Sequence, residues 1–259
     1  MARVGELEAL FLAAAAAVAG AINAVAGGGS LISFPALIAA GFDPVPANVT
    51  NTVALWPGYV AGSWAYRPEL ARQSGRAVRL APACIAGAGA GSVLLLATPP
   101  EAFEAIVPFL IYGACAAMLL QRRLRSAAER HRFRGGGRRA ATALHGSVFV
   151  LAVYGAYFGA GLGIVLLAVL LVLLPDDIQR ANALKGLLSA VINSVAAVWF
   201  AVFGPVSWTA AAAMAAGSLL GGYGGVGIAR RLGAERLRWA VILYGAAVGS
   251  LLLVRAAQA

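Results

Sequence analysis

Charged residues are scarce in this chain. Only 12% of its 259 residues are charged, and there are 10 acidic against 20 basic residues. A soluble domain needs polar groups over its surface, and a sequence that is 61% hydrophobic, with a mean hydropathy of +0.83, cannot supply them. This shortage excludes a water-soluble globular protein.

Residue patterns that carry chemistry are also missing. The two cysteines, Cys84 and Cys115, lie in apolar segments without a C-x-x-C or metal-ligand pattern, so we expect buried structural thiols. No nucleophile–base set and no metal motif occurs, and the lack of a P-loop argues against a self-contained ATP-driven pump. We expect a protein that is not an enzyme and that needs no cofactor.

Long apolar runs are abundant. Eight of them approach or exceed the roughly 20 residues that a membrane-crossing helix needs: 7–26, 47–66, 78–97, 105–120, 141–161, 180–203, 207–229 and 239–254. A cleaved signal peptide is the alternative for residues 9–26, but Arg3, Glu6 and Glu8 give it a mixed rather than a basic flank. The sequence predicts an all-α, multi-pass protein of the cytoplasmic membrane.

The net charge of +10 lies mostly in the loops. Eight arginines fall within residues 121–139, together with Gly135, Gly136 and Gly137. Positive loops of membrane proteins face the cytoplasm, so this charge indicates topology and not a nucleic-acid partner. We predict a basic cytoplasmic linker, 121–140, between a first transmembrane repeat, 1–120, and a second, 141–259.

The two halves align at an offset of 134 residues. Gly27 then falls on Gly161, Asp43 on Asp177 and Asn48 on Asn182. Corresponding loops have opposite charge: loop 67–79 is basic and 204–208 uncharged, whereas loop 98–104 is acidic and 230–238 basic. By the positive-inside rule they face opposite sides. With the short segments 30–40 and 162–174 counted, we predict two inverted repeats of about five segments each and both termini outside the cytoplasm.

Glycine breaks occupy matching positions in the two halves, as in secondary transporters with short broken helices near the membrane midplane. They are Gly27-Gly28-Gly29-Ser30 and the run from Gly159 to Gly163. A helix that begins after such a run points unpaired N–H groups at the cavity, which suits an anion. We predict that Gly27, Gly28, Gly29, Ser30, Gly161 and Gly163 bind substrate. The alternative is tight helix packing, which we expect for Gly87/Gly91 and Gly217/Gly221/Gly225.

Polar residues follow each break. We predict that they also bind substrate: Asn23, Asn48, Asn51, Thr52, Tyr157, Asn182, Lys185, Ser189 and Asn193. Asn182, Lys185, Ser189 and Asn193 share one helical face by their spacing. Lys185 is the only lysine, and an ionisable group inside a membrane segment indicates function, although its stem could instead carry the ammonium to the interface. Asp43 and Asp176/Asp177 are expected to cap helices.

Two stretches carry a family resemblance, "NAVAGGGSLISFPALIAAGFDPVPANVTNTVALWPGYVAGSWAY" and "GAYFGAGLGIVLLAVLLVLLPDDIQRANALKGLLSAVINSVAAVWF". Together they resemble the two halves of the sulfite exporter TauE/SafE family, although Ala160 and Leu162 interrupt the second glycine run. The resemblance implies a permease for small organic or inorganic anions, sulfite and sulfoacetate being the usual suggestions.

We therefore expect a secondary transporter whose partners are a small anionic substrate, the lipid bilayer and a coupling proton or sodium ion. The alternative is a membrane scaffold or assembly factor that docks partners through the basic linker. In that case deletion of residues 126–137 would abolish function, while Lys185 would be dispensable.

Overall fold

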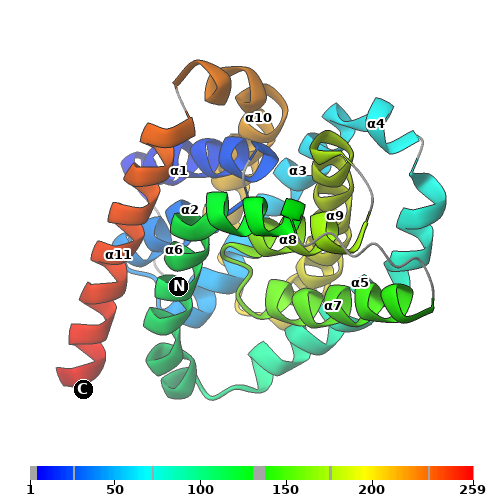
Figure 1. Ribbon diagram of the computed structural model, residues 1–259. Coiled ribbons are helices and arrows are strands. Elements are labelled where there is room, and N and C mark those ends of the chain that lie inside the picture. Colours follow the sequence, from blue (N-terminus) through cyan, green and yellow to red (C-terminus); the bar gives the residue numbers. More distant parts are fainter. Residues whose placement is uncertain are drawn as a thin grey trace.

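The computed structural model describes residues 5–25, 27–71, 73–130, 138–174, 177–232 and 234–258, and Figure 1 shows that these form an assembly of helices. The helices are α1 (Glu6–Val25), α2 (Ser30–Ala39), α3 (Pro44–Ala65), α4 (Arg67–Ala71), α5 (Ser74–Ala97), α6 (Pro100–Arg130), α7 (Arg138–Tyr157), α8 (Leu162–Leu173), α9 (Ile178–Phe203), α10 (Trp208–Leu232) and α11 (Ala234–Gln258). The described residues contain no strand, and the all-α prediction is confirmed.

Several helices are suited to a bilayer. Five described segments are long and apolar enough to cross it: Glu6–Ala24, Ser74–Ala97, Pro100–Leu124, Arg139–Tyr157 and Ile178–Phe203. Large apolar side chains such as Leu7, Val150 and Val198 are more than half exposed, which is costly in water but favourable against lipid. The chain is a multi-pass membrane protein.

The two short helices α2 and α8 lie in the interior. They have 10 and 12 residues and rise only about 15 and 18 Å, too little to cross the hydrocarbon core alone. Leu31, Phe34 and Leu37 of α2 are almost fully buried, as are Leu166 and Leu170 of α8. Longer helices therefore surround both short ones, so the breaks that precede α2 and α8 lie within protein.

Helix positions recur along the chain at the offset that aligns Gly27 with Gly161. By position α1 corresponds to α7, α2 to α8, α3 to α9, α5 to α10 and α6 to α11. The packing follows the same correspondence, because α1 packs on α10 and α7 on α5, while α3 packs on α10 and α9 on α5 (Figure 1). The halves fold alike and exchange helix partners across the molecule.

Corresponding helices that touch run in opposite directions. Beyond the end of α3, Gln73 Nε2 donates to the backbone oxygen of Arg180, 3.0 Å away at the start of α9. Beyond the end of α9, the Ser207 N–H donates to Thr50 Oγ1, 3.0 Å away near the start of α3. Thus α3 begins where α9 ends, and α6 and α11 are antiparallel in the same way. This arrangement supports inverted repeats, whose orientation in the bilayer stays a prediction.

Close packing between the halves depends on glycine. A Cβ added to Gly217 or Gly221 of α10 would collide with the backbone of α1. A Cβ on Gly87 or Gly91 of α5 would likewise collide with the backbone of α7. The predicted packing role is confirmed for these four glycines, whereas the surroundings of Gly225 lie outside the described residues.

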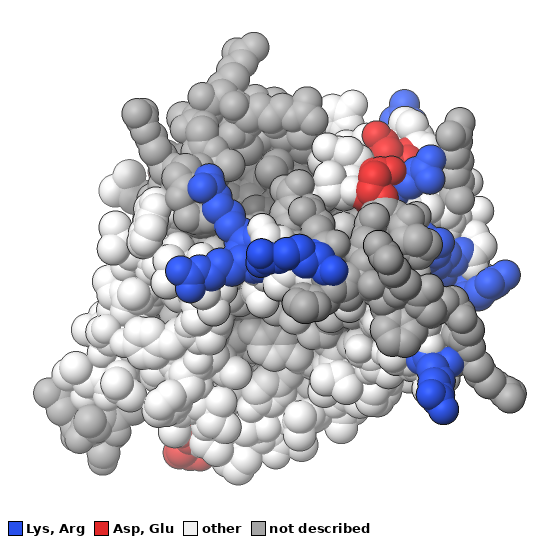
Figure 2. Space-filling view, in the orientation of Figure 1, with Lys and Arg blue, Asp and Glu red and all other residues white. Residues whose placement is uncertain are grey.

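Described basic residues gather where α5, α7 and α9 begin. His145 Nε2 of α7 lies 3.2 Å from the backbone oxygen of Arg79 of α5, and the Gln73–Arg180 bond joins α5 to α9. Figure 2 shows one face of the molecule, on which basic side chains outnumber acidic ones. Residues 121–130 of the predicted linker continue α6 as helix, and 131–137 lie outside the described residues.

Candidate functional site

The two glycine breaks meet at the centre of the molecule. Gly27 and Gly28 have φ angles of 79° and 110°, and Gly161 has one of 76°, a region that residues with a Cβ rarely adopt. A Cβ added to Gly27 would lie 2.7 Å from the Cα of Gly163. The backbone of the first break therefore rests directly on the second half, which only glycine permits.

Asn23, the last polar residue of α1, holds the first break in place. Its side-chain Oδ1 accepts hydrogen bonds from the N–H groups of Gly28 at 3.1 Å and Gly29 at 2.7 Å. The Gly27 N–H donates to the backbone oxygen of Ile22 at 3.0 Å. The expectation that these three N–H groups are unpaired is thus wrong, because the Asn23 amide and the last turn of α1 already bind them. A ligand at this break stays a prediction.

Lys185 lies against the same break. Its side chain is 2% exposed, and Nζ donates to the backbone oxygen of Asn23 at 3.3 Å. Its Cδ lies 3.5 Å from the Cβ position of Gly163. The ammonium does not reach the surface, so the interface alternative is wrong. No described residue supplies it with a carboxylate.

Asn48 makes the corresponding contact in the other half. Its Nδ2 donates to the backbone oxygen of Tyr157, the last residue of α7, at 2.8 Å. Tyr157 is the counterpart of Asn23 at the 134-residue offset, and its ring packs edge-on against Phe103 with centroids 5.7 Å apart. Each broken helix therefore ends on a donor from the other half.

Three predicted asparagines leave an oxygen without a partner. The Oδ1 atoms of Asn48, Asn51 and Asn182 are buried and accept no hydrogen bond. All three residues are predicted to bind substrate, and the atoms that they leave open are hydrogen-bond acceptors. Asn48 and Asn182 are counterparts, so the feature recurs in both halves.

The other predicted residues are buried but satisfied locally. On α9, Asn193 Nδ2 donates to the backbone oxygen of Ser189 at 2.9 Å, and on α3, Thr52 Oγ1 donates to that of Asn48 at 3.0 Å. Ser30 lies beside the hydroxyl of Tyr59, a residue that the sequence analysis missed. Tyr59 could have been predicted as a site residue, because it aligns with the predicted residue Asn193 at the 134-residue offset.

The predicted caps differ between the halves. Asp177 Oδ1 accepts from the N–H groups of Gln179 at 2.9 Å and Arg180 at 3.0 Å, which confirms it as the cap of α9. Asp43 occupies the same position before α3 but makes no side-chain cap bond, so that prediction is wrong. Pro46 at the third helical position has no N–H, which removes one of the two groups that such a cap usually binds. Asp176 lies outside the described residues.

Replacing Asp177 with alanine should lower the apparent melting temperature by about 2–4 °C at neutral pH. The Arg180 N–H, followed by that of Gln179, holds the Asp177 pKa below its usual value. The cap therefore contributes fully above about pH 4, the ordinary pKa of aspartate, and its contribution fades as pH falls through the lowered pKa. Melting curves between pH 3 and 8 should converge at the acidic end, and a constant difference would contradict the cap.

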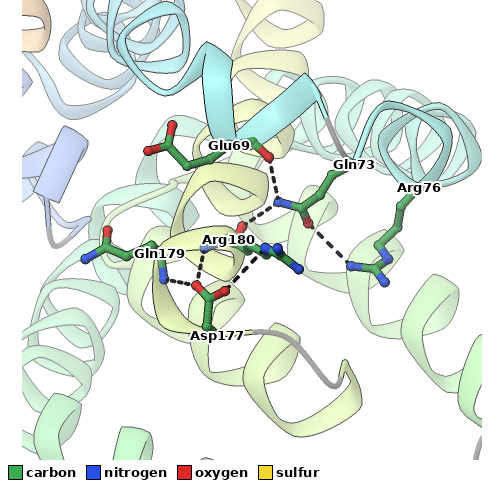
Figure 3. Close-up of polar contacts among 6 residues, drawn as sticks. All are labelled: Glu69, Gln73, Arg76, Asp177, Gln179 and Arg180. Carbon is green, nitrogen blue, oxygen red and sulfur yellow. Dashed lines mark hydrogen bonds and ion pairs between the residues drawn. The ribbon is translucent and has the colours of Figure 1, made fainter.

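A polar cluster ties the halves together at the basic end. Figure 3 shows Gln73 between α4 and the start of α9, where Nε2 reaches the Arg180 oxygen and Oε1 accepts from Arg76 Nη1 at 3.4 Å. Arg180 also pairs with Asp177 at 3.3 Å. Gln73 and Ser207 are counterparts, so the bond from Ser207 to Thr50 is the equivalent tie at the opposite end of α3 and α9.

Proteins similar to this chain are named as membrane transporters. A family model described as "Sulfite exporter TauE/SafE" matches residues 12–252. "Probable membrane transporter protein YfcA" of Escherichia coli (strain K12) is 26% identical over 245 residues, covering 92% of this chain and 87% of that protein. "Probable membrane transporter protein" of Haemophilus influenzae is 26% identical over 234 residues, 87% of each chain. "Probable membrane transporter protein ORF9" of Sinorhizobium sp is 27% identical over 251 residues, 94% and 91% of the two chains. No solved structure matches.

Proposed function

Because the chain belongs to the sulfite exporter TauE/SafE family and is a membrane transporter, we propose that it moves a small sulfur-containing or organic anion across the cytoplasmic membrane by secondary transport. The observation that carries this proposal is the ammonium of Lys185. It is buried where the two breaks meet, and no described residue neutralises it. A buried cation without a carboxylate is costly, and an anionic ligand would compensate it.

The predicted hydrogen-bond donors differ in whether their N–H groups are free to bind an anion. The glycine N–H groups are engaged by Asn23 and Ile22, so an anion would first meet the ammonium. Nζ can donate three hydrogen bonds, and one goes to the Asn23 oxygen. Two N–H bonds of Lys185 therefore remain for oxygen atoms of a sulfite, sulfonate or carboxylate.

Alternating access would come from opening one end of the α3/α9 pair at a time. The Gln73–Arg180 bond closes the end where the basic residues gather, and the Ser207–Thr50 bond closes the opposite end. We propose that these bonds act as inner and outer latches of two inverted halves. With both bonds formed, the proposed transporter would be in an occluded state.

Breaking one latch should open one side only. We expect that Gln73→Ala, which removes one hydrogen bond, raises labelling of a Ser63→Cys reporter from the cytoplasmic side by about 2–10-fold. Ser63 is buried near Gly186, at the inner end of α3. The measurement uses an impermeant maleimide on inside-out vesicles, with Cys84 and Cys115 replaced by alanine. Thr50→Val, the matched outer variant, should leave this rate unchanged, and equal effects of both variants would refute separate latches.

Transport itself is tested with purified protein in proteoliposomes. The panel contains sulfite, sulfate, small sulfonates and carboxylates, with and without a proton gradient and with sodium or choline as the cation. At least one sulfur-containing or organic anion should accumulate above empty liposomes. If none of these anions moves while the protein is folded and inserted, the proposed function is wrong.

A further inference from the structure

Different side chains bind the carbonyl ends of α1 and α7. At the end of α1, Lys185 places an ammonium against the Asn23 oxygen. The equivalent oxygen at the end of α7, that of Tyr157, accepts from the neutral amide of Asn48. Asn51 is the counterpart of Lys185 at the repeat offset, and it carries no charge. The second half therefore places a cation at the end of α1, whereas the described residues of the first half place none at the end of α7.

Two buried asparagines of α3, in the first half, have an amide oxygen without a partner. Asn48 is 1% exposed and Asn51 is 2% exposed, and neither Oδ1 accepts a hydrogen bond. The orientation of the Asn48 amide is fixed, because Nδ2 donates to a backbone oxygen that can only accept. Its Oδ1 therefore cannot be exchanged for a donor by turning the amide. A buried acceptor without a partner is unfavourable, so a ligand that it coordinates would stabilise this part of the protein.

The surroundings favour a cation as that ligand. Asn48 and Asn51 are three residues apart on one face of α3. Asn48 lies against the carbonyl end of α7, where the helix dipole is negative. Amide and backbone oxygens are hard ligands that suit small metal cations, and helix ends of this kind coordinate sodium in transporters with broken helices.

We propose that Oδ1 of Asn48 and of Asn51, together with the carbonyl end of α7, bind a small monovalent metal cation such as sodium. The bound ion occupies the place that the Lys185 ammonium takes in the other half. Its use as the coupling ion rests on the proposed function, whereas its binding does not. An anion at Lys185 and a cation at Asn48 would then be carried together.

Binding is tested by thermal unfolding of the purified full chain in sodium, potassium or choline chloride at constant ionic strength, without added anion substrate. Sodium at about 100 times its dissociation constant should raise the apparent melting temperature over that in choline by roughly 5–10 °C. Asn48→Ala should abolish this shift. Ser92→Ala is the matched control, because it removes a buried polar group bonded within its own helix, and it should keep the shift.

A second variant tests the site without depending on the stability of Asn48→Ala. Asn51→Lys places in α3 an ammonium at the position that corresponds to Lys185 of α9. This ammonium should replace the bound cation, so the variant should fold and its melting temperature should not respond to sodium. The absence of a metal-ion shift in the wild type, or a shift that persists in both Asn48→Ala and Asn51→Lys, would overturn the proposal. Anion transport that proceeds equally well in choline would remove the coupling role and leave the proposed transporter function intact.

Discussion

Replacing Lys185 with methionine should lower anion transport by roughly 100-fold. A hydrogen bond to a charged group contributes about 1.5–3 kcal/mol, and each 1.4 kcal/mol corresponds to a factor of ten. Methionine keeps most of the length of the side chain that packs near Gly163, so the effect isolates the ammonium. The measurement is the initial rate of uptake into proteoliposomes at equal amounts of inserted protein.

A structural role for Lys185 predicts a different result. If the ammonium only capped α1 through the Asn23 oxygen, methionine would lower the melting temperature. If it serves an anion, removal of a buried charge without a carboxylate leaves stability unchanged or raised. Arg123→Gln is the control, because it removes one positive charge from an exposed position on α6 and should not affect transport. Normal transport by Lys185→Met would exclude Lys185 from the site.

Gly27→Ala should destabilise the protein by about 2–5 kcal/mol. The φ of 79° costs a residue with a Cβ roughly 1–2 kcal/mol, and overpacking in a dense interior costs roughly 1–3 kcal/mol. The added methyl would lie 2.7 Å from the Cα of Gly163. This atom belongs to the backbone, so it cannot rotate away as a side chain could. Transport should fall with stability, because the two breaks could no longer touch.

Two other glycines separate these contributions. Gly41 has a φ of 85° and nothing within 4 Å of its Cβ position, so Gly41→Ala carries the conformational cost alone. Gly113 in α6 has ordinary helical φ and open space, and Gly113→Ala should stabilise the helix by about 0.5–1 kcal/mol. The apparent melting temperatures should fall in the order Gly113→Ala, wild type, Gly41→Ala, Gly27→Ala. A Gly27 variant as stable as the Gly41 variant would show that the contact between the breaks is not required.

Much of the candidate site could be located from the sequence, because the signals were local. Glycine runs mark breaks since few other residues adopt positive φ, and spacings of three and four place Asn182, Lys185, Ser189 and Asn193 together. All four side chains are buried in α9. The bonds made by these residues were not predictable, because a partner such as the Asn23 oxygen lies 162 positions away from Lys185.

The sequence by itself determined the class of protein, the breaks and the correspondence between the halves, since hydropathy and residue spacing act within one segment. Only the tertiary structure decided that the amide of Asn23 takes the N–H groups of the first break. It also decided that Lys185 remains inside and that Asn48 and Asn51 keep open oxygens. The physical reason is that a helix fixes which residues share a face, whereas the groups opposite that face come from the packing of distant helices.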